Sequence, residues 1–146
     1  MKTMVHTMGY KWECATYEGR VVEKQENVPI EELEEEIREM RTPAEMDELE
    51  EWLKSRPPKV EKVARMFPPW QLYRIKEGAP YRFTVSGSVV SAYKFVECID
   101  GVGVDVYFRV LQSPIGYAGV VAHISPAFLE PITLDDLKEE VKDESH

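Results

Sequence analysis

The chain has 146 residues, of which 43% are hydrophobic and 31% charged, and its formal net charge at pH 7 is −9. This length and composition suit one globular unit whose core needs neither disulfides nor a structural metal. No apolar run approaches the ~20 residues of a membrane helix, so we expect no membrane partner. The negative charge argues against nucleic acid as a partner, because nucleic-acid binding needs a cationic surface.

The negative charge is concentrated in two segments. Residues 26–56 contain twelve acidic and four basic side chains, and residues 133–146 contain six acidic and two basic ones. The remaining residues are close to neutral, so the sequence predicts an anionic flank and an acidic tail rather than a uniformly charged surface.

The first residues, MKTMVHTMGYKWEC, lack the apolar centre of a signal peptide. We therefore expect a cytoplasmic location, either in a cell or in an infected host. Cys14 and Cys98 have neither the paired-cysteine nor the Cys/His spacing of a zinc site, and we expect both thiols to be reduced and buried.

The N-terminal part predicts a β-hairpin over residues 10–25. Tyr10, Trp12 and Cys14 alternate with other residues at the period of a strand that has one buried face. Glu18 and Gly19 suit a two-residue turn between the two strands of this hairpin.

Three helices are expected to follow. The first covers residues 28–40, with an apolar stripe at helical spacing and Asn27 as its N-cap. The second begins at Thr42 and Pro43, where Glu45 completes a capping box. The third lies within residues 55–67 and ends at Pro68 and Pro69, which cannot continue a helix.

From Trp70 onwards the pattern changes to the period of strands. Turn residues separate five strand candidates, at 70–75, 81–85, 89–99, 102–111 and 116–124. Residues 125–132 predict one helical turn and a short closing strand, and residues 133–146 predict a short capped helix that frays.

The fold class we expect is α+β, with an N-terminal β-hairpin and acidic amphipathic helices followed by a small antiparallel β-sheet or SH3-like barrel. Residues 1–69 form the hairpin and helical segment, 70–132 the sheet or barrel, and 133–146 the acidic tail, all within one compact unit. Three amphipathic helices offer more apolar surface than a small barrel covers, so we also expect a homo-oligomer.

No catalytic motif emerges. GVGVD at 101–105 lacks the third glycine and the helix of a dinucleotide site, and SGS at 86–88 is not a nucleophile elbow. Glu97, Asp100 and Asp105 surround one turn and suit Mg²⁺, but acidic residues are common in turns for local reasons. We predict no catalytic residue, no metal and no cofactor, and an enzyme is the less favoured class.

The leading hypothesis is a non-enzymatic regulatory protein that binds a protein partner with a basic surface. An acidic inhibitor of a nucleic-acid-handling enzyme, of the phage or mobile-element type, is one form of it. Acidic helices steer such a partner, and Trp and Tyr are typical interface anchors. The predicted partner-binding residues are Glu31, Glu34, Glu35, Glu45, Glu48, Trp70 and Tyr73.

The alternative hypothesis is a protein or minor enzyme that binds a small anionic ligand, such as a nucleotide or metabolite, in a pocket between barrel and helices. Arginine side chains bind phosphate and carboxylate groups through two parallel hydrogen bonds. The residues predicted to line this pocket are Arg74, Arg82, Tyr93, Arg109 and His123.

Overall fold

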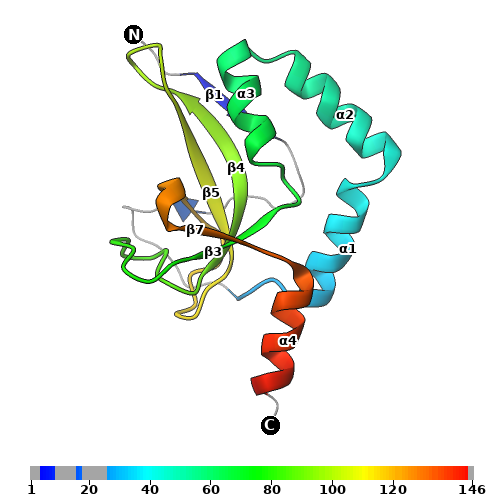
Figure 1. Ribbon diagram of the computed structural model, residues 1–146, viewed down its shortest axis with the longest axis vertical. Coiled ribbons are helices and arrows are strands. Elements are labelled where there is room, and N and C mark those ends of the chain that lie inside the picture. Colours follow the sequence, from blue (N-terminus) through cyan, green and yellow to red (C-terminus); the bar gives the residue numbers. More distant parts are fainter. Residues whose placement is uncertain (1–3, 9–15, 18–25, 145–146) are drawn as a thin grey trace.

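The computed structural model describes residues 4–8, 16–17 and 26–144. In the described part of the chain, three helices lie beside one curved, mostly antiparallel sheet and a fourth extends beyond it at the C-terminal end (Figure 1), so the α+β class is confirmed. The helices are α1 (Ile30–Met40), α2 (Pro43–Lys54), α3 (Pro58–Met66) and α4 (Leu134–Glu144), with a 3-10 turn at Pro126–Phe128. The strands are β1 (Val5–Thr7), β2 (Thr16–Tyr17), β3 (Leu72–Ile75), β4 (Val89–Glu97), β5 (Val104–Gln112), β6 (Val120–His123) and β7 (Leu129–Ile132).

The sheet is built around the long hairpin of β4 and β5. Its strand order is β2-β6-β5-β4-β3-β7, and β1 pairs with the second half of β4, beyond β3. A register shift between Ala92 and Lys94 interrupts the β4–β5 ladder. Bulges of this kind bend a strand and increase its twist, which explains how the same edge of β4 pairs with two different strands.

The SH3-like barrel is not closed. Among the described residues, β2 and β7 are the two ends of the strand order and do not pair with each other. The predicted hairpin at 10–25 lies mostly outside the described residues. Its Thr16 and Tyr17 form β2, which pairs in parallel with β6.

The strand predicted at 81–85 is wrong, because these residues lie in the irregular connection between β3 and β4. The alternating aromatics that suggested a strand instead anchor this connection. Tyr81 packs edge-to-face on Phe128 and its hydroxyl accepts a hydrogen bond from the Ser125 amide at 2.8 Å, while Phe83 packs on Tyr117. Both edges of β3 are already occupied by β4 and β7, so this segment has no free edge of β3 to join.

Local capping chemistry sets the start of α2, whereas α1 and α3 each follow a proline and have no side-chain cap. The Thr42 hydroxyl accepts a hydrogen bond from the Glu45 amide, and Pro43 is the first residue of α2, as predicted. Asn27 does not cap α1. Its side-chain oxygen accepts a hydrogen bond from the Ser113 amide at 2.8 Å, and Pro29 precedes the helix without a side-chain cap. Asn27 therefore fixes α1 to the end of β5 instead of capping it.

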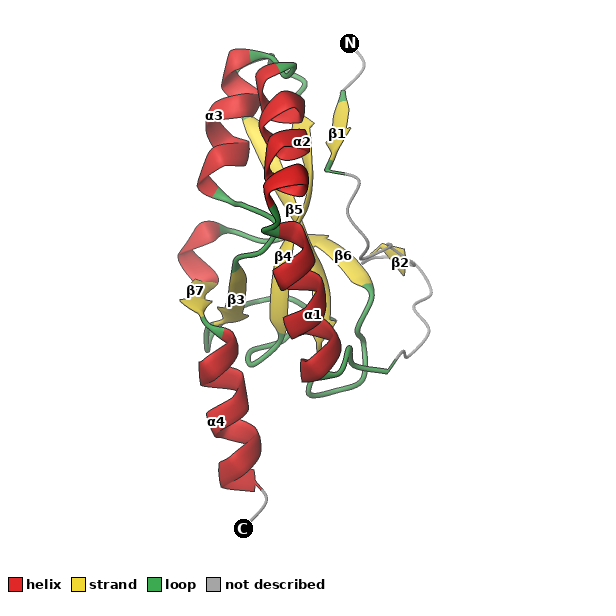
Figure 2. Cartoon of the chain, turned by 90° about the vertical axis from the view of Figure 1, so that its right-hand side faces the viewer, coloured by secondary structure: helices red, strands yellow, loops and turns green. Residues whose placement is uncertain are grey.

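Two apolar cores lie on opposite faces of the sheet. Val90 and Val110 belong to the core under α2 and α3, whereas their chain neighbours Val89 and Leu111 belong to the core under α1. Successive strand residues point to opposite faces, so the sheet separates these cores. Figure 2 shows α2 and α3 beside one half of the sheet and α1 beside the other. Each of the two cores is therefore formed by helices and strands together.

No helix in the described part of the chain combines the length and apolar character needed to cross a bilayer.

Candidate interaction surface

Helices α1 and α2 follow each other closely and present carboxylates along their outer sides. Leu33 and Met40 of α1 and Leu49 and Leu53 of α2 point into the cores, which leaves the acidic residues on the opposite, solvent-facing sides. Seven of these carboxylates make no ion pair in the described part of the chain: Glu31, Glu32, Glu35, Glu45, Asp47, Glu48 and Glu51.

Two other glutamates of the same helices hold the fold together. Glu34 accepts from Lys138 of α4 at 2.9 Å, and Glu50 of α2 forms a two-bond pair with Arg65 of α3 at 2.8 and 3.0 Å. These hydrogen bonds with Lys138 and Arg65 are the largest causes of lowered pKa values at Glu34 and Glu50. The acidic segment therefore combines structural ion pairs with unneutralised charge.

The structure brings the five predicted partner-binding glutamates onto these two helices. Glu31, Glu35 and Glu48 are exposed, while Glu34 is the residue paired with Lys138. Glu45 is half-buried beside the N-cap of α2. Three of the five are thus fully available to another molecule.

The two predicted aromatic anchors differ in exposure. Trp70 is half-buried, contacts both cores, and has the Arg41 guanidinium 5.7 Å from its ring centre. Tyr73 is buried between Phe67 and Phe108, and burial raises the pKa of its hydroxyl. Tyr73 is a core residue, so we leave it out of the surface proposed below.

The five residues of the alternative ligand pocket are spread over the molecule. Arg74 on β3 forms a two-bond ion pair with Glu140 of α4, with one bond of 2.6 Å. Arg82 is exposed in the β3–β4 connection, with its guanidinium 5.2 Å from the Phe83 ring centre. None of the five lines the cavities described below.

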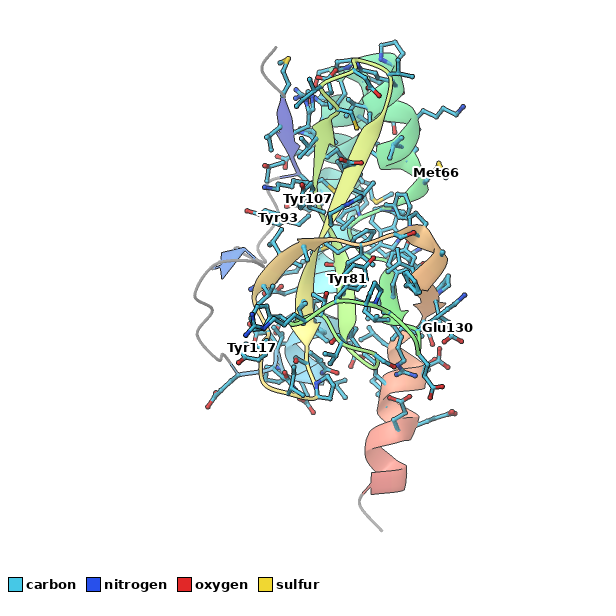
Figure 3. The ribbon with its side chains drawn as sticks, turned by 90° about the vertical axis from the view of Figure 1, so that its left-hand side faces the viewer. Met66, Tyr81, Tyr93, Tyr107, Tyr117 and Glu130 are labelled. Atoms are coloured by element: carbon cyan, nitrogen blue, oxygen red, sulfur yellow. The ribbon has the colours of Figure 1, made fainter. Side chains whose placement is uncertain are left out.

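The other three lie on the central strands. Tyr93 and Arg109 are half-buried on β4 and β5, close to Tyr107, which Figure 3 labels beside Tyr93. His123 on β6 is half-exposed and its Nε2 is 3.5 Å from an Asp105 oxygen. An exposed histidine beside an exposed carboxylate lacks the enclosure that acid–base chemistry needs.

The acids around the β4–β5 turn serve separate local purposes. Asp100 accepts hydrogen bonds from the amides of Val102 and Gly103 at 2.8 and 3.2 Å, which lower its pKa. No group of three or more metal-ligating side chains occurs in the described residues. Cys98 is a half-buried free thiol whose pKa is raised, first by burial and then by Asp105, whereas Cys14 lies outside the described residues.

A buried histidine that sequence reasoning missed connects β1 to the helices. His6 is 4% exposed, and Arg56 donates to its Nδ1 at 3.1 Å. Because arginine only donates, the ring proton is on Nε2, which donates to Glu97 at 2.9 Å. Lys59 pairs with the other Glu97 oxygen at 2.9 Å. No local pattern around His6 predicts this network, because its partners are at positions 56 and 97.

The hydrogen bonds of Glu97 make the stability of the fold depend on pH. Hydrogen bonds from His6 and then Lys59 lower its pKa below the ordinary value of 4.5. The resulting stabilisation is therefore present above about pH 4.5 and is lost as the pH falls through the folded-state pKa. We expect the free energy of unfolding, measured by urea titration from about pH 6 to about pH 3, to fall less steeply in Glu97→Gln than in the natural chain. Glu48→Gln, which removes an unpaired exposed glutamate, is the control and should keep the natural slope.

The cavities lined by described residues include three of different character. One, of about 310 Å³, is polar and lies between the end of β5 and α4, and one of about 190 Å³ lies beside α1 and Trp70. The third, of about 250 Å³, is a groove between α2 and α3. No local pattern in the sequence predicts this groove, because its lining comes from α2, α3 and residues 68–70.

No family model, no curated protein and no solved structure matches this chain. The geometry of its own surface is therefore the basis for the function proposed next.

Proposed function

We propose that the protein is a non-enzymatic regulatory protein that binds a protein partner with a basic surface. The observation that supports this proposal is the row of seven carboxylates on α1 and α2 that have no ion-pair partner in the described part of the chain. Asp47 and Glu51 are one helical turn apart, and like charges at this spacing destabilise a helix. A cationic partner offsets that repulsion.

These charges act mainly by raising the rate at which the chain and its partner associate. Charged surfaces of opposite sign raise association rates by about 10- to 1000-fold, and they suppress partners of the wrong sign. The partner class we propose is an enzyme that handles nucleic acid in the cytoplasm, because its phosphate-binding surface must be cationic. An anionic helical surface competes with nucleic acid for such a site.

The test compares two sets of four substitutions. The helix variant carries Glu31→Gln, Glu35→Gln, Glu48→Gln and Glu51→Gln. The matched control carries Glu26→Gln, Glu77→Gln, Glu130→Gln and Glu139→Gln, which are also exposed and lie outside α1 and α2. Both variants have the same net charge, so they differ only in where the charge is removed.

Proteins captured from host extract by the natural chain are purified, and their association rates are measured at several salt concentrations. We expect the helix variant to associate at least about tenfold more slowly at low salt, with the control close to the natural rate. The captured enzyme should also lose activity on nucleic acid when the chain is added. Affinity that does not change between low and high salt would refute the electrostatic basis of the proposal.

A further inference from the structure

The side chain of His6 ties β1 to two different parts of the fold. Figures 1 and 2 show β1 at the same end of the molecule as the connection between α2 and α3. The ring faces that connection, because His6 pairs with Phe95 of β4, whose side chain lies in the core under α2 and α3. Its Nε2 donates to Glu97 at 2.9 Å and its Nδ1 accepts from Arg56 at 3.1 Å. One ring nitrogen therefore holds β1 to the sheet and the other holds it to the helices.

The charged groups around the His6 ring come from three elements. Glu97 ends β4, Lys59 is on α3 and 2.9 Å from the second Glu97 oxygen, and Arg56 lies in the α2–α3 connection. Lys94 of β4 lies on the opposite face of the sheet. With a neutral ring, one carboxylate faces two positive charges. A positive ring adds a third, at a site where the ring is only 4% exposed.

The neutral ring has one acceptor, and Arg56 uses it. Arginine only donates hydrogen bonds, so the lone pair of Nδ1 points at the guanidinium. Nε2 already carries the proton that Glu97 accepts. A second proton must therefore bind at Nδ1, where it leaves two positively charged donors facing each other at 3.1 Å. The bond to Arg56 is then lost, whereas the bond to Glu97 becomes an ion pair between opposite charges.

We propose that His6 is a pH-dependent switch, in which a proton on Nδ1 releases Arg56 and the α2–α3 connection from β1 while Glu97 keeps β1 on the sheet. Arg56 has other contacts that can hold it after release. Its Nη2 donates to the Ser55 hydroxyl at 3.0 Å, and its guanidinium is 5.1 Å from the centre of the Trp52 ring. The release is therefore local and does not require α2 or α3 to unfold.

The switch changes how the C-terminal end of α2 is held. With a neutral ring, β1 braces this end through Arg56. With a protonated ring, α2 keeps its two-bond pair between Glu50 and Arg65 of α3 but loses the link to β1. Histidine side chains titrate between about pH 5 and 8, so this release takes place closer to neutral pH than the loss of the Glu97 hydrogen bonds. The inference is independent of the proposed binding to a basic partner.

NMR spectra that correlate the ring nitrogens with the ring hydrogens test the switch directly, because they show which nitrogen carries a proton. At about pH 8 we expect His6 to carry its proton on Nε2 alone. Between about pH 8 and about pH 5, Nδ1 should gain a proton, and the side-chain signals of Arg56 should shift with the same midpoint. The Glu97 amide, which donates to the Met4 carbonyl at 3.0 Å, should keep its protection from hydrogen exchange over this range.

Two arginine substitutions separate the local contact from a general loss of charge. Arg56→Gln keeps a donor for Nδ1 and removes the positive charge. The midpoint of the His6 titration should then rise by at least about 0.5 pH unit, because a like charge within about 4–6 Å disfavours the charged ring. Arg38→Gln removes the same charge from α1, where Arg38 pairs with Glu34 and is 72% exposed, and should leave the midpoint unchanged. His123, on β6, serves as an internal reference that neither substitution should move.

Each of several results would overturn the switch. A proton on Nδ1 at about pH 8 would do so, because Arg56 could not then donate to it. The same holds for a ring that stays neutral down to about pH 5, or for Arg56 signals that do not follow the His6 titration. Loss of protection at the Glu97 amide together with that titration would show that β1 leaves the sheet, which contradicts local release. Should Arg56→Gln fail to fold, the spectra of the natural chain decide.

Discussion

Phe108→Ala should lower the free energy of unfolding by about 3–5 kcal/mol, the cost typical of removing a fully buried aromatic ring. Phe108 is on β5, which lies between β4 and β6, and its side chain has no exposed surface. Phe67 and Tyr73 pack edge-on against its ring, with centres 5.6 and 5.9 Å away. The substitution therefore removes contacts to a helix end, to β3 and to the sheet at the same time.

Urea unfolding monitored by circular dichroism measures this loss. Val102→Ala is the control, because Val102 at the tip of the β4–β5 hairpin is 80% exposed, and substitutions at such positions change stability by about 0.5 kcal/mol or less. A loss below about 1 kcal/mol for Phe108→Ala would mean that the core closes around the cavity, and that α3 and β3 do not depend on this ring for their position.

The helices and most strands could be predicted because their signals are local. Thr42 and Pro43 define the start of α2 through short-range hydrogen bonding and a fixed φ angle, whatever the rest of the chain does. The alternation in 102–111 predicts β5 because Val106, Phe108 and Val110 share one buried face. Patterns of this kind need no knowledge of distant residues.

The errors arose where distant residues decide the outcome. Tyr81 and Phe83 show strand alternation, but their partners Phe128 and Tyr117 are far along the chain and hold the segment in an irregular form. Asn27 has the chemistry of a helix cap, yet the Ser113 amide takes its oxygen. Barrel closure likewise depends on whether the strands at the two ends of the sheet meet, which no local pattern encodes.

The candidate site divides in the same way. Helical periodicity predicted that carboxylates of α1 and α2 face solvent, and the structure agrees for Glu31, Glu35 and Glu48. It could not predict that Glu34 is paired with Lys138, since the two residues are on helices from opposite ends of the chain. The groove between α2 and α3 also depends on packing, because its lining residues come from two helices and from residues 68–70.

Leu33→Ala should lower the free energy of unfolding by about 2–5 kcal/mol. Leu33 is the fully buried residue of α1, and it belongs to the core formed with Leu72, Leu111 and Leu137 on the face of the sheet opposite Phe108. The substitution weakens the attachment of α1, which carries part of the anionic surface.

Because the sheet separates the two cores, the losses from Leu33→Ala and Phe108→Ala should add to within about 0.5 kcal/mol in the double variant, as they do for residues without shared contacts. Urea unfolding of the two single variants and the double variant measures this coupling. A coupling energy above about 1 kcal/mol would show that the cores act as one unit, and that the acidic helix is positioned by the whole sheet rather than by its own apolar contacts.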